Sequence, residues 1–252
     1  MVGSLEHLAK AYVKVGWFIP AYVQMGGITN LARAIDASAD GLTDTQMQNV
    51  LGLIYSPEGL AAMVVHRYSI TPVICDYKET IAEAVEAHCM GLHHVAVAGL
   101  APVIEGAGRQ LAANYGIAGA KTIRDVLQKL GERCRRESTA NQRGEWEEIA
   151  SMMDSFTTWT RDHFYRGSSS YPSSDGTNRN GILHGTFRDQ EFGSPLNFYK
   201  VISAVDFLTF VSSVQTSGIS WFAPSPSPQS GKLAIYYRAI ALAAKLRPSR
   251  VV

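Results

Sequence analysis

Cysteine is scarce in this chain of 252 residues, which contains only three copies at widely separated positions. Cys75, Cys89 and Cys134 lack the close spacing of a Cys-x-x-Cys metal site and the density of a disulfide-stabilised domain. We therefore exclude those two classes and expect buried, reduced thiols of the kind found in a cytoplasmic protein.

Long hydrophobic runs are also missing. No apolar stretch reaches the roughly 18 to 20 residues that a membrane-spanning helix needs, and the N-terminus lacks a basic segment leading into an apolar core. These absences predict a cytoplasmic protein with no membrane partner.

The chain has no surplus of charge of either sign. Its 23 Lys and Arg residues nearly balance its 22 Asp and Glu residues, so the formal net charge is +1. Any contact with nucleic acid therefore has to come from a local basic patch. The sequence also contains no Gly-rich nucleotide fingerprint, no Walker pattern and no Gly-x-Ser-x-Gly motif.

Strand-like alternation is scarce, whereas apolar residues recur at helical spacing along the chain. One amphipathic stripe starts at Ile123 and a second at Trp146, which predicts two antiparallel helices. Thr43 followed by Gln46 has the pattern of a capping box, and Ser56 before a proline marks another helix start. We therefore predict an all-α helical bundle.

The predicted helices divide the chain into two parts. An N-terminal helical extension covers residues 1–70, and a helical domain with a C-terminal helix covers residues 71–252. Pro102 should kink the helix that contains it. The last helix carries an apolar stripe that could pack on the body of the protein or on a second copy. Helices are expected at residues 5–15, 28–35, 71–90, 92–113, 198–214 and 233–246.

Candidate chemistry is concentrated in the segment from Asn178 to Gly185, where a loop rich in Ser, Pro and Gly enters a short helix. At about 100° per residue, Asn180 and His184 lie about 40° apart on one helical face. Arg179 stands at the helix entrance, where the helix dipole and free N–H groups favour an anion. The segment therefore predicts a phosphate pocket with a proton-transfer group beside it.

The Arg-Asn-x-x-x-His pattern of Arg179, Asn180 and His184, followed by glycine and by the apolar helix at 198–214, resembles the HEPN superfamily of all-helical RNases. The resemblance covers residues 74–214 and none of the first 70. It implies an HEPN-like fold and an endoribonuclease that needs no metal or cofactor.

The resemblance also implies a mechanism, in which the ribose 2′-hydroxyl attacks the adjacent phosphorus and leaves a 2′,3′-cyclic phosphate. His184 would move protons, because an imidazole titrates near neutral pH. Arg179 would stabilise charge on the phosphorane oxygens, and Asn180 would fix the imidazole or the phosphate. Such RNases join two copies of the motif across a two-fold axis, which implies a homodimer with a composite site.

Two other interpretations remain open. The chain could be an HEPN-like module that binds RNA, nucleotide or a partner protein without turnover, in a toxin–antitoxin system with a cognate antitoxin or in phage defence. Alternatively, both motif side chains could be structural, with His184 donating to a carbonyl and Arg179 capping a neighbouring helix.

A charged pair precedes the motif on an otherwise apolar helix. Glu105 and Arg109 stand four residues apart, within reach of an ion pair. One interpretation is that they pair with each other on the helix surface. The other is that one or both of them face His184 and orient Arg179 or the substrate.

Three further features carry weaker signals. His88, His93 and His94 have no acidic residue at ligand spacing, so we expect no metal site. The cationic cluster 133–136 fits a solvated helix face or a contact with an RNA backbone. The loop 166–177 directly precedes the motif and could gate access to it.

Overall fold

The computed structural model describes residues 4–38, 42–142, 145–171 and 174–248. Within these residues all regular structure is helical, which confirms the all-α prediction. Two π-helical turns, Val64–Tyr68 and Thr160–Phe164, continue α4 and α8, and short 3-10 turns span Ile74–Tyr77 and Ser168–Ser170. The α-helices are α1 (Ser4–Val13), α2 (Met25–Ala37), α3 (Asp44–Ile54), α4 (Pro57–Met63), α5 (Lys78–Cys89), α6 (His93–Asn114), α7 (Ile123–Asn141), α8 (Trp146–Trp159), α9 (Arg179–Leu183), α10 (Pro195–Gln215) and α11 (Pro228–Lys245).

Side-chain caps set several of the helix starts. The Thr43 hydroxyl accepts from the Gln46 N–H at 3.3 Å, and the Gln46 side chain accepts from the Thr43 N–H at 2.9 Å. This reciprocal pair is the predicted capping box, and it satisfies two N–H groups that a helix terminus otherwise leaves unpaired. Ser194 and Asn197 repeat the arrangement at the start of α10, and Ser56 caps α4.

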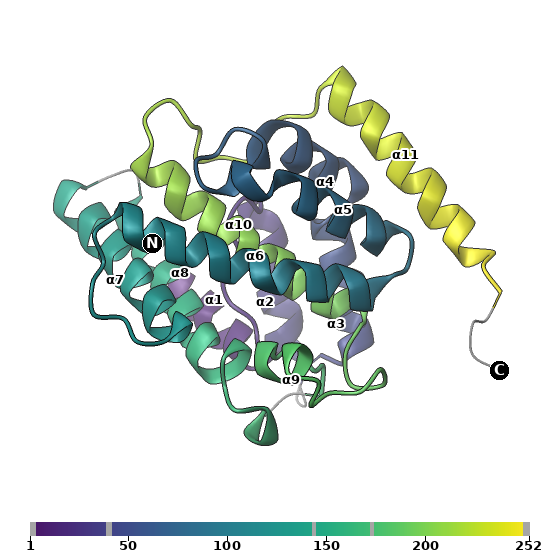
Figure 1. The fold of residues 1–252 in the computed structure, drawn as a ribbon, viewed down its shortest axis with the longest axis horizontal. Helices are drawn as coiled ribbons and strands as arrows, with labels where there is room; N and C mark the ends of the chain where they lie inside the picture. The colour runs from purple at the N-terminus through teal and green to yellow at the C-terminus, as the bar shows by residue number, and fades with distance from the viewer. Residues whose placement is uncertain (1–3, 39–41, 143–144, 172–173, 249–252) are drawn as a thin grey trace.

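The helix α10 passes through the middle of the molecule behind α6 (Figure 1). Nineteen of its 21 residues are buried, and it packs against α6 and α3. A helix that is covered on every side has to be apolar on every side. Large apolar residues occur on every side of α10, and its buried Ser203, Thr209 and Ser213 hydroxyls donate to carbonyls of the preceding turn, so α10 can serve as the axis of the bundle.

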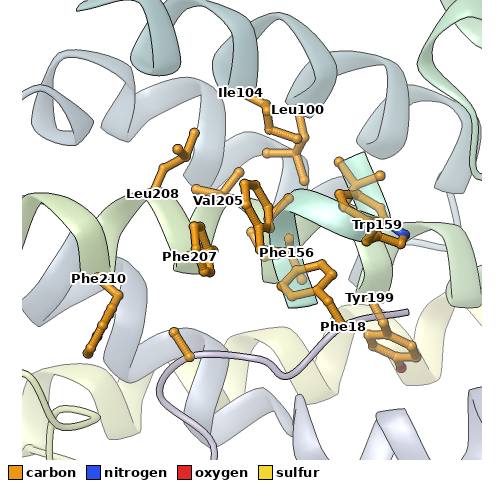
Figure 2. Close-up of a cluster of buried hydrophobic side chains, with 14 of the residues drawn as sticks. Phe18, Leu100, Ile104, Phe156, Trp159, Tyr199, Val205, Phe207, Leu208 and Phe210 are labelled. Carbon is orange, nitrogen blue, oxygen red and sulfur yellow. The ribbon is translucent and has the colours of Figure 1, made fainter. Parts of the chain in front are cut away.

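Aromatic rings from distant segments meet beside α10 (Figure 2). Phe207 of α10 stacks on Phe156 of α8 with ring centroids 3.7 Å apart, and Phe18 meets Phe156 edge-on at 5.1 Å. Trp159 packs 4.9 Å from Phe18. Each buried ring removes a large apolar area from water, so this cluster contributes strongly to stability.

The first 70 residues share this core with the rest of the chain. Trp17 is buried, and its ring N–H donates to the Ser203 hydroxyl of α10 at 2.9 Å. Trp159 donates in turn to the carbonyl of Gly16 at 3.0 Å. The N-terminal segment is thus packed into the bundle, while a domain boundary at residue 70 stays a prediction.

The prediction of a helix at 71–90 is wrong for residues 71–77. Val73 has φ of 69°, a left-handed conformation that a helix of L-residues does not accept. The Thr71 N–H bonds back to the Arg67 carbonyl at 3.1 Å, and Ser212 of α10 donates to the Pro72 carbonyl at 2.9 Å. These contacts end the preceding helix and create a turn, so α5 begins only at Lys78.

The other long helices lie close to their predicted positions. The helices α7 and α8 run antiparallel, as predicted, since Gly131 faces Thr157 while Arg135 pairs with Asp154 further back along α8. The last helix begins earlier than expected, at Pro228, because Ser227 caps it. Among the described residues, no helix combines the length and the apolar character needed to cross a bilayer.

Candidate functional site

The Arg-Asn-x-x-x-His motif starts with α9, a helix of only five residues, and its His184 is the cap residue that follows the helix. The start of α9 is fixed by Asn178, whose side-chain oxygen accepts from the Gly181 N–H at 2.8 Å. The Asn178 amide also donates to the carbonyls of His163 and Arg166, at 2.8 and 2.9 Å. Asn178 is fully buried, so it joins the motif rigidly to the turn that ends α8.

Arg179 is the centre of the site. Its Nε atom forms an ion pair with Glu105 Oε1 of α6, and its Nη1 atom is 2.9 Å from His184 Nε2. The same Nη1 donates to Asn180 Oδ1 at 3.3 Å. The Arg179 side chain is 19% exposed, so the guanidinium is held by three groups and still reaches the surface.

His184 lies exposed at the C-terminal end of α9. A guanidinium can only donate hydrogen bonds, so the contact with Arg179 requires an unprotonated Nε2 on His184. The contact couples the His184 imidazole to the Arg179 guanidinium.

Asn180 supports Arg179 rather than the imidazole. Its Oδ1 accepts from Arg179, while its Nδ2 donates to the carbonyls of Tyr165 and Arg166 at 3.3 and 3.1 Å. The described contact between Asn180 and His184 is the backbone bond from the His184 N–H to the Asn180 carbonyl, at 3.2 Å. The amide therefore positions the guanidinium.

Glu105 and Arg109 have different places in this site. Among the described residues the ion-pair partner of Glu105 is Arg179, and no ion pair joins Glu105 to Arg109. Arg109 lies exposed, one turn further along α6. Burial raises the pKa of the Tyr165 hydroxyl and Glu105 adds to the rise, whereas the cations Arg179 and Arg109 oppose it. Of the two residues, Glu105 contacts Arg179, and its role in orienting Arg179 stays a prediction.

Two glycines shape the turn that presents His184. A Cβ atom on Gly181 would lie 2.5 Å from the ring of Phe187, so only glycine lets that ring pack under α9. Gly185 has φ of 67°, the left-handed conformation that ends a helix at low cost. Together they hold the helix short and leave His184 at its exposed end.

The sequence did not reveal the buried ion pair that anchors the preceding loop. Asp175 and Lys200 are each 2% exposed and form an ion pair between the loop and α10. Asp175 also accepts from the Tyr171 hydroxyl at 2.6 Å and from the Thr177 N–H at 3.1 Å. The charge of Lys200 within a helix of many apolar residues was the sequence signal that could have indicated a buried partner.

The loop 166–177 was predicted to gate access to the motif. Residues 172–173 of this loop lie outside the described residues, and the C-terminal part of the loop is fixed by the ion pair of Asp175.

The three neighbouring histidines occupy packed positions. His88 stacks on Phe198 at 3.9 Å and lies 5.0 Å from His93, with both distances taken between ring centroids. Burial lowers the pKa of His88 to about 3 and that of His93 to about 4. His94 packs against Phe192, and its Nε2 is 3.0 Å from a backbone carbonyl. In the part of the chain that the structure describes, no three His, Cys, Asp or Glu side chains are grouped to hold a metal ion.

The cationic cluster 133–136 is partly paired. Arg133 forms an ion pair with Glu137 at 2.7 Å, and Arg135 reaches Asp154 of α8 at 3.3 Å. These contacts are on or near the surface, where such pairs contribute little to stability. They suit a solvated helix face, and an RNA-backbone contact through this cluster stays a hypothesis.

Comparisons with known proteins found no match to this chain among family models, curated proteins or solved structures.

Proposed function

We propose that the protein is a metal-independent endoribonuclease of HEPN type, and that Arg179 and His184 carry its chemistry. One observation supports this most strongly: Glu105 and Asn180 hold Arg179 in contact with Nε2 of the exposed His184. A forked cation beside an unprotonated imidazole is the pair of groups that phosphate-ester cleavage needs.

The contact between the two side chains suggests an order of events. An RNA phosphate oxygen accepts from Arg179 Nη1 in place of His184 Nε2. The released Nε2 then takes the proton of the ribose 2′-hydroxyl while O2′ attacks phosphorus. The P–O5′ bond breaks, the 5′-oxygen takes a proton from an acid, and a 2′,3′-cyclic phosphate remains.

This sequence needs a base and an acid, and each chain supplies one His184. A homodimer in which two α9 segments face each other supplies both groups without a further residue. One His184 is then the base and the partner copy's His184 is the acid. The dimer and a cytoplasmic location both belong to this proposal.

A binding module without turnover is the second candidate, and the ion pair itself favours it. Glu105 neutralises Arg179, which weakens the attraction of the site for a polyanion. Such a module would bind RNA, nucleotide or a partner protein, such as an antitoxin, through the same surface.

The deciding experiment incubates pure protein with a labelled single-stranded RNA in EDTA. Wild type should cut the RNA, His184→Ala should lose at least about a hundredfold in rate, and Arg179→Lys should lose most of the activity. Binding without cutting by wild type would select the second candidate. A His184→Ala variant that cuts as fast as wild type would remove His184 from the mechanism.

Mixed subunits test the composite site. Combining His184→Ala with Arg179→Ala protein should give an activity that differs from that of either parent, because some mixed dimers hold one intact set of groups. A protein that cuts RNA while sedimenting as a monomer at micromolar concentration would contradict the dimer.

A further inference from the structure

The last helix, α11, is apolar on two opposite faces. One face packs on α4 and α5. There Ala234 and Tyr237 are buried, and an ion pair between Arg238 and Glu58 of α4 fixes the helix beside them. This face accounts for the attachment of α11 to the body, at the edge of the molecule in Figure 1.

The opposite face is apolar and uncovered. At about 100° per residue, its four side chains fall within about 60° of one another and point away from the buried face. Three are large aliphatic groups with 67%, 63% and 86% of their surface exposed. A contiguous exposed stripe of this kind marks an interaction surface more often than scattered apolar residues do. The outer face consists of Ile235, Ala239 and Leu242 of α11 and of Leu246, the cap residue that follows the helix.

The charged side chains that α11 itself carries are all cations. All 22 acidic residues of the chain precede Phe207, so α11 carries no carboxylate side chain. Lys232 lies on one side of the apolar stripe, and Arg238 and Lys245 lie on the other, by the same helical geometry. Arg238 is paired with Glu58, whereas Lys232 and Lys245 form no ion pair among the described residues. The exposed apolar face therefore has an unpaired cation on each of its margins.

We propose that the outer face of α11 binds an anionic lipid surface. The helix would lie parallel to the membrane, with the aliphatic side chains in the interfacial region and the basic side chains at the headgroup phosphates. The sequence-based expectation of no membrane partner rested on the absence of a spanning run, and a surface-bound helix needs none. This proposal does not depend on the proposed function.

Other occupants fit the charges less well. A second copy seated on the same face would add its own Lys232 and Lys245 to the margins of the contact without any carboxylate from α11, and like charges repel. Single-stranded RNA would gain little from the stripe, because Ile and Leu offer no ring on which bases stack.

Vesicle flotation tests the proposal with the full chain. Vesicles of phosphatidylglycerol and phosphatidylcholine should bind the protein, and pure phosphatidylcholine vesicles should bind it weakly. Leu242→Glu should lower the partition coefficient at least about tenfold, because it removes one buried aliphatic side chain and adds a repelled charge. Val95→Glu is the matched control, since Val95 of α6 has the same 63% exposure and should bind as wild type does.

Circular dichroism should show that both variants are folded, because each replaced side chain is exposed. Leu246→Glu provides a second test on the same face. The proposal is overturned if folded wild type does not bind the anionic vesicles, or if Leu242→Glu binds as well as wild type. It is also overturned if Val95→Glu weakens binding equally, or if lipid-free protein forms dimers that Leu242→Glu dissociates.

Discussion

Two ion pairs in this protein, each between a carboxylate and a basic side chain, differ in their exposure to solvent. Asp175 and Lys200 are each 2% exposed, whereas Glu105 and Arg179 are 17% and 19% exposed. The first pair is sealed between a loop and α10. The second opens toward His184, which faces solvent.

The surroundings decide what each pair can do. Burial alone would raise the pKa of Asp175, but the Lys200 ammonium, the Tyr171 hydroxyl and the Thr177 N–H together hold it below its usual range. Lys200 also donates to the Val15 carbonyl at 2.8 Å. A pair so fully enclosed fixes the structure, while a partly exposed cation next to an exposed imidazole remains accessible to a substrate.

The largest expected effect comes from breaking the enclosed pair. Asp175→Ala leaves the Lys200 ammonium buried without its carboxylate, which should lower the free energy of unfolding by about 3–5 kcal/mol. Urea unfolding measures the change. The double variant Asp175→Ala with Lys200→Met should recover much of the loss, because no charge is then buried. A loss below about 1 kcal/mol in the single variant would mean that water reaches Lys200.

Asp206 of α10 is also a buried carboxylate, but no ion pair joins it to a cation among the described residues. Burial raises the pKa of Asp206 to about 7, and a 2.5 Å hydrogen bond from Tyr68 opposes part of the rise. The unfolded value is near 3.9, so between about pH 4 and pH 7 the folded protein holds a proton that the unfolded chain has lost. The contribution of Asp206 to stability therefore falls as pH rises through this window.

Asp206→Asn should remove this pH-dependent fall. Relative to wild type, the variant should gain on the order of a few kcal/mol in unfolding free energy between about pH 4 and pH 7. Urea unfolding at several pH values provides the measurement. A constant difference across the window would show that Asp206 ionises with an ordinary pKa.

The partly exposed pair should respond through activity more than stability. Glu105→Gln removes the charge that is paired with Arg179, and RNA cleavage should slow by about tenfold if the pair orients Arg179. The unfolding free energy should change by less than about 1 kcal/mol, because the pair is partly solvated. Arg109→Gln is the matched control on α6 and should have a smaller effect on cleavage. Equal losses in both variants would contradict a specific role for the contact between Glu105 and Arg179 in cleavage.

The smallest stability effect is expected at His184. Its side chain is exposed at the end of a five-residue helix, so His184→Ala should change the unfolding free energy by no more than about 0.5 kcal/mol. Thermal unfolding tests this. A substantially larger loss would support the interpretation in which His184 is structural.

The sequence predicted the helices well wherever a local signal marked them. The Thr43 and Ser56 caps act within three residues, and the apolar spacing from Ile123 onward repeats every turn. Such signals are visible without knowledge of the fold. The start of α5 was missed because the conformation of Val73 depends on contacts with α10, which is remote in sequence.

The grouping of the candidate site residues also followed from the sequence only where the residues are close together in the chain. Arg179, Asn180 and His184 are neighbours on one short helix, so helical geometry places them together. Glu105 reaches them only through the packing of α6 on α9. The pairing of Asp175 with Lys200 likewise joins residues 25 positions apart, and no periodic pattern encodes it.

The most direct test of the account examines the chemistry of the cut. Two matched oligonucleotides, one all-ribose and one with 2′-deoxyribose at the cleaved nucleotide, are incubated with wild-type protein in EDTA, and the new 3′ ends are analysed by mass. The account predicts a 2′,3′-cyclic phosphate from the all-ribose RNA and no cut at the deoxy position. Equal cleavage of both oligonucleotides, or no cleavage of either, would contradict it.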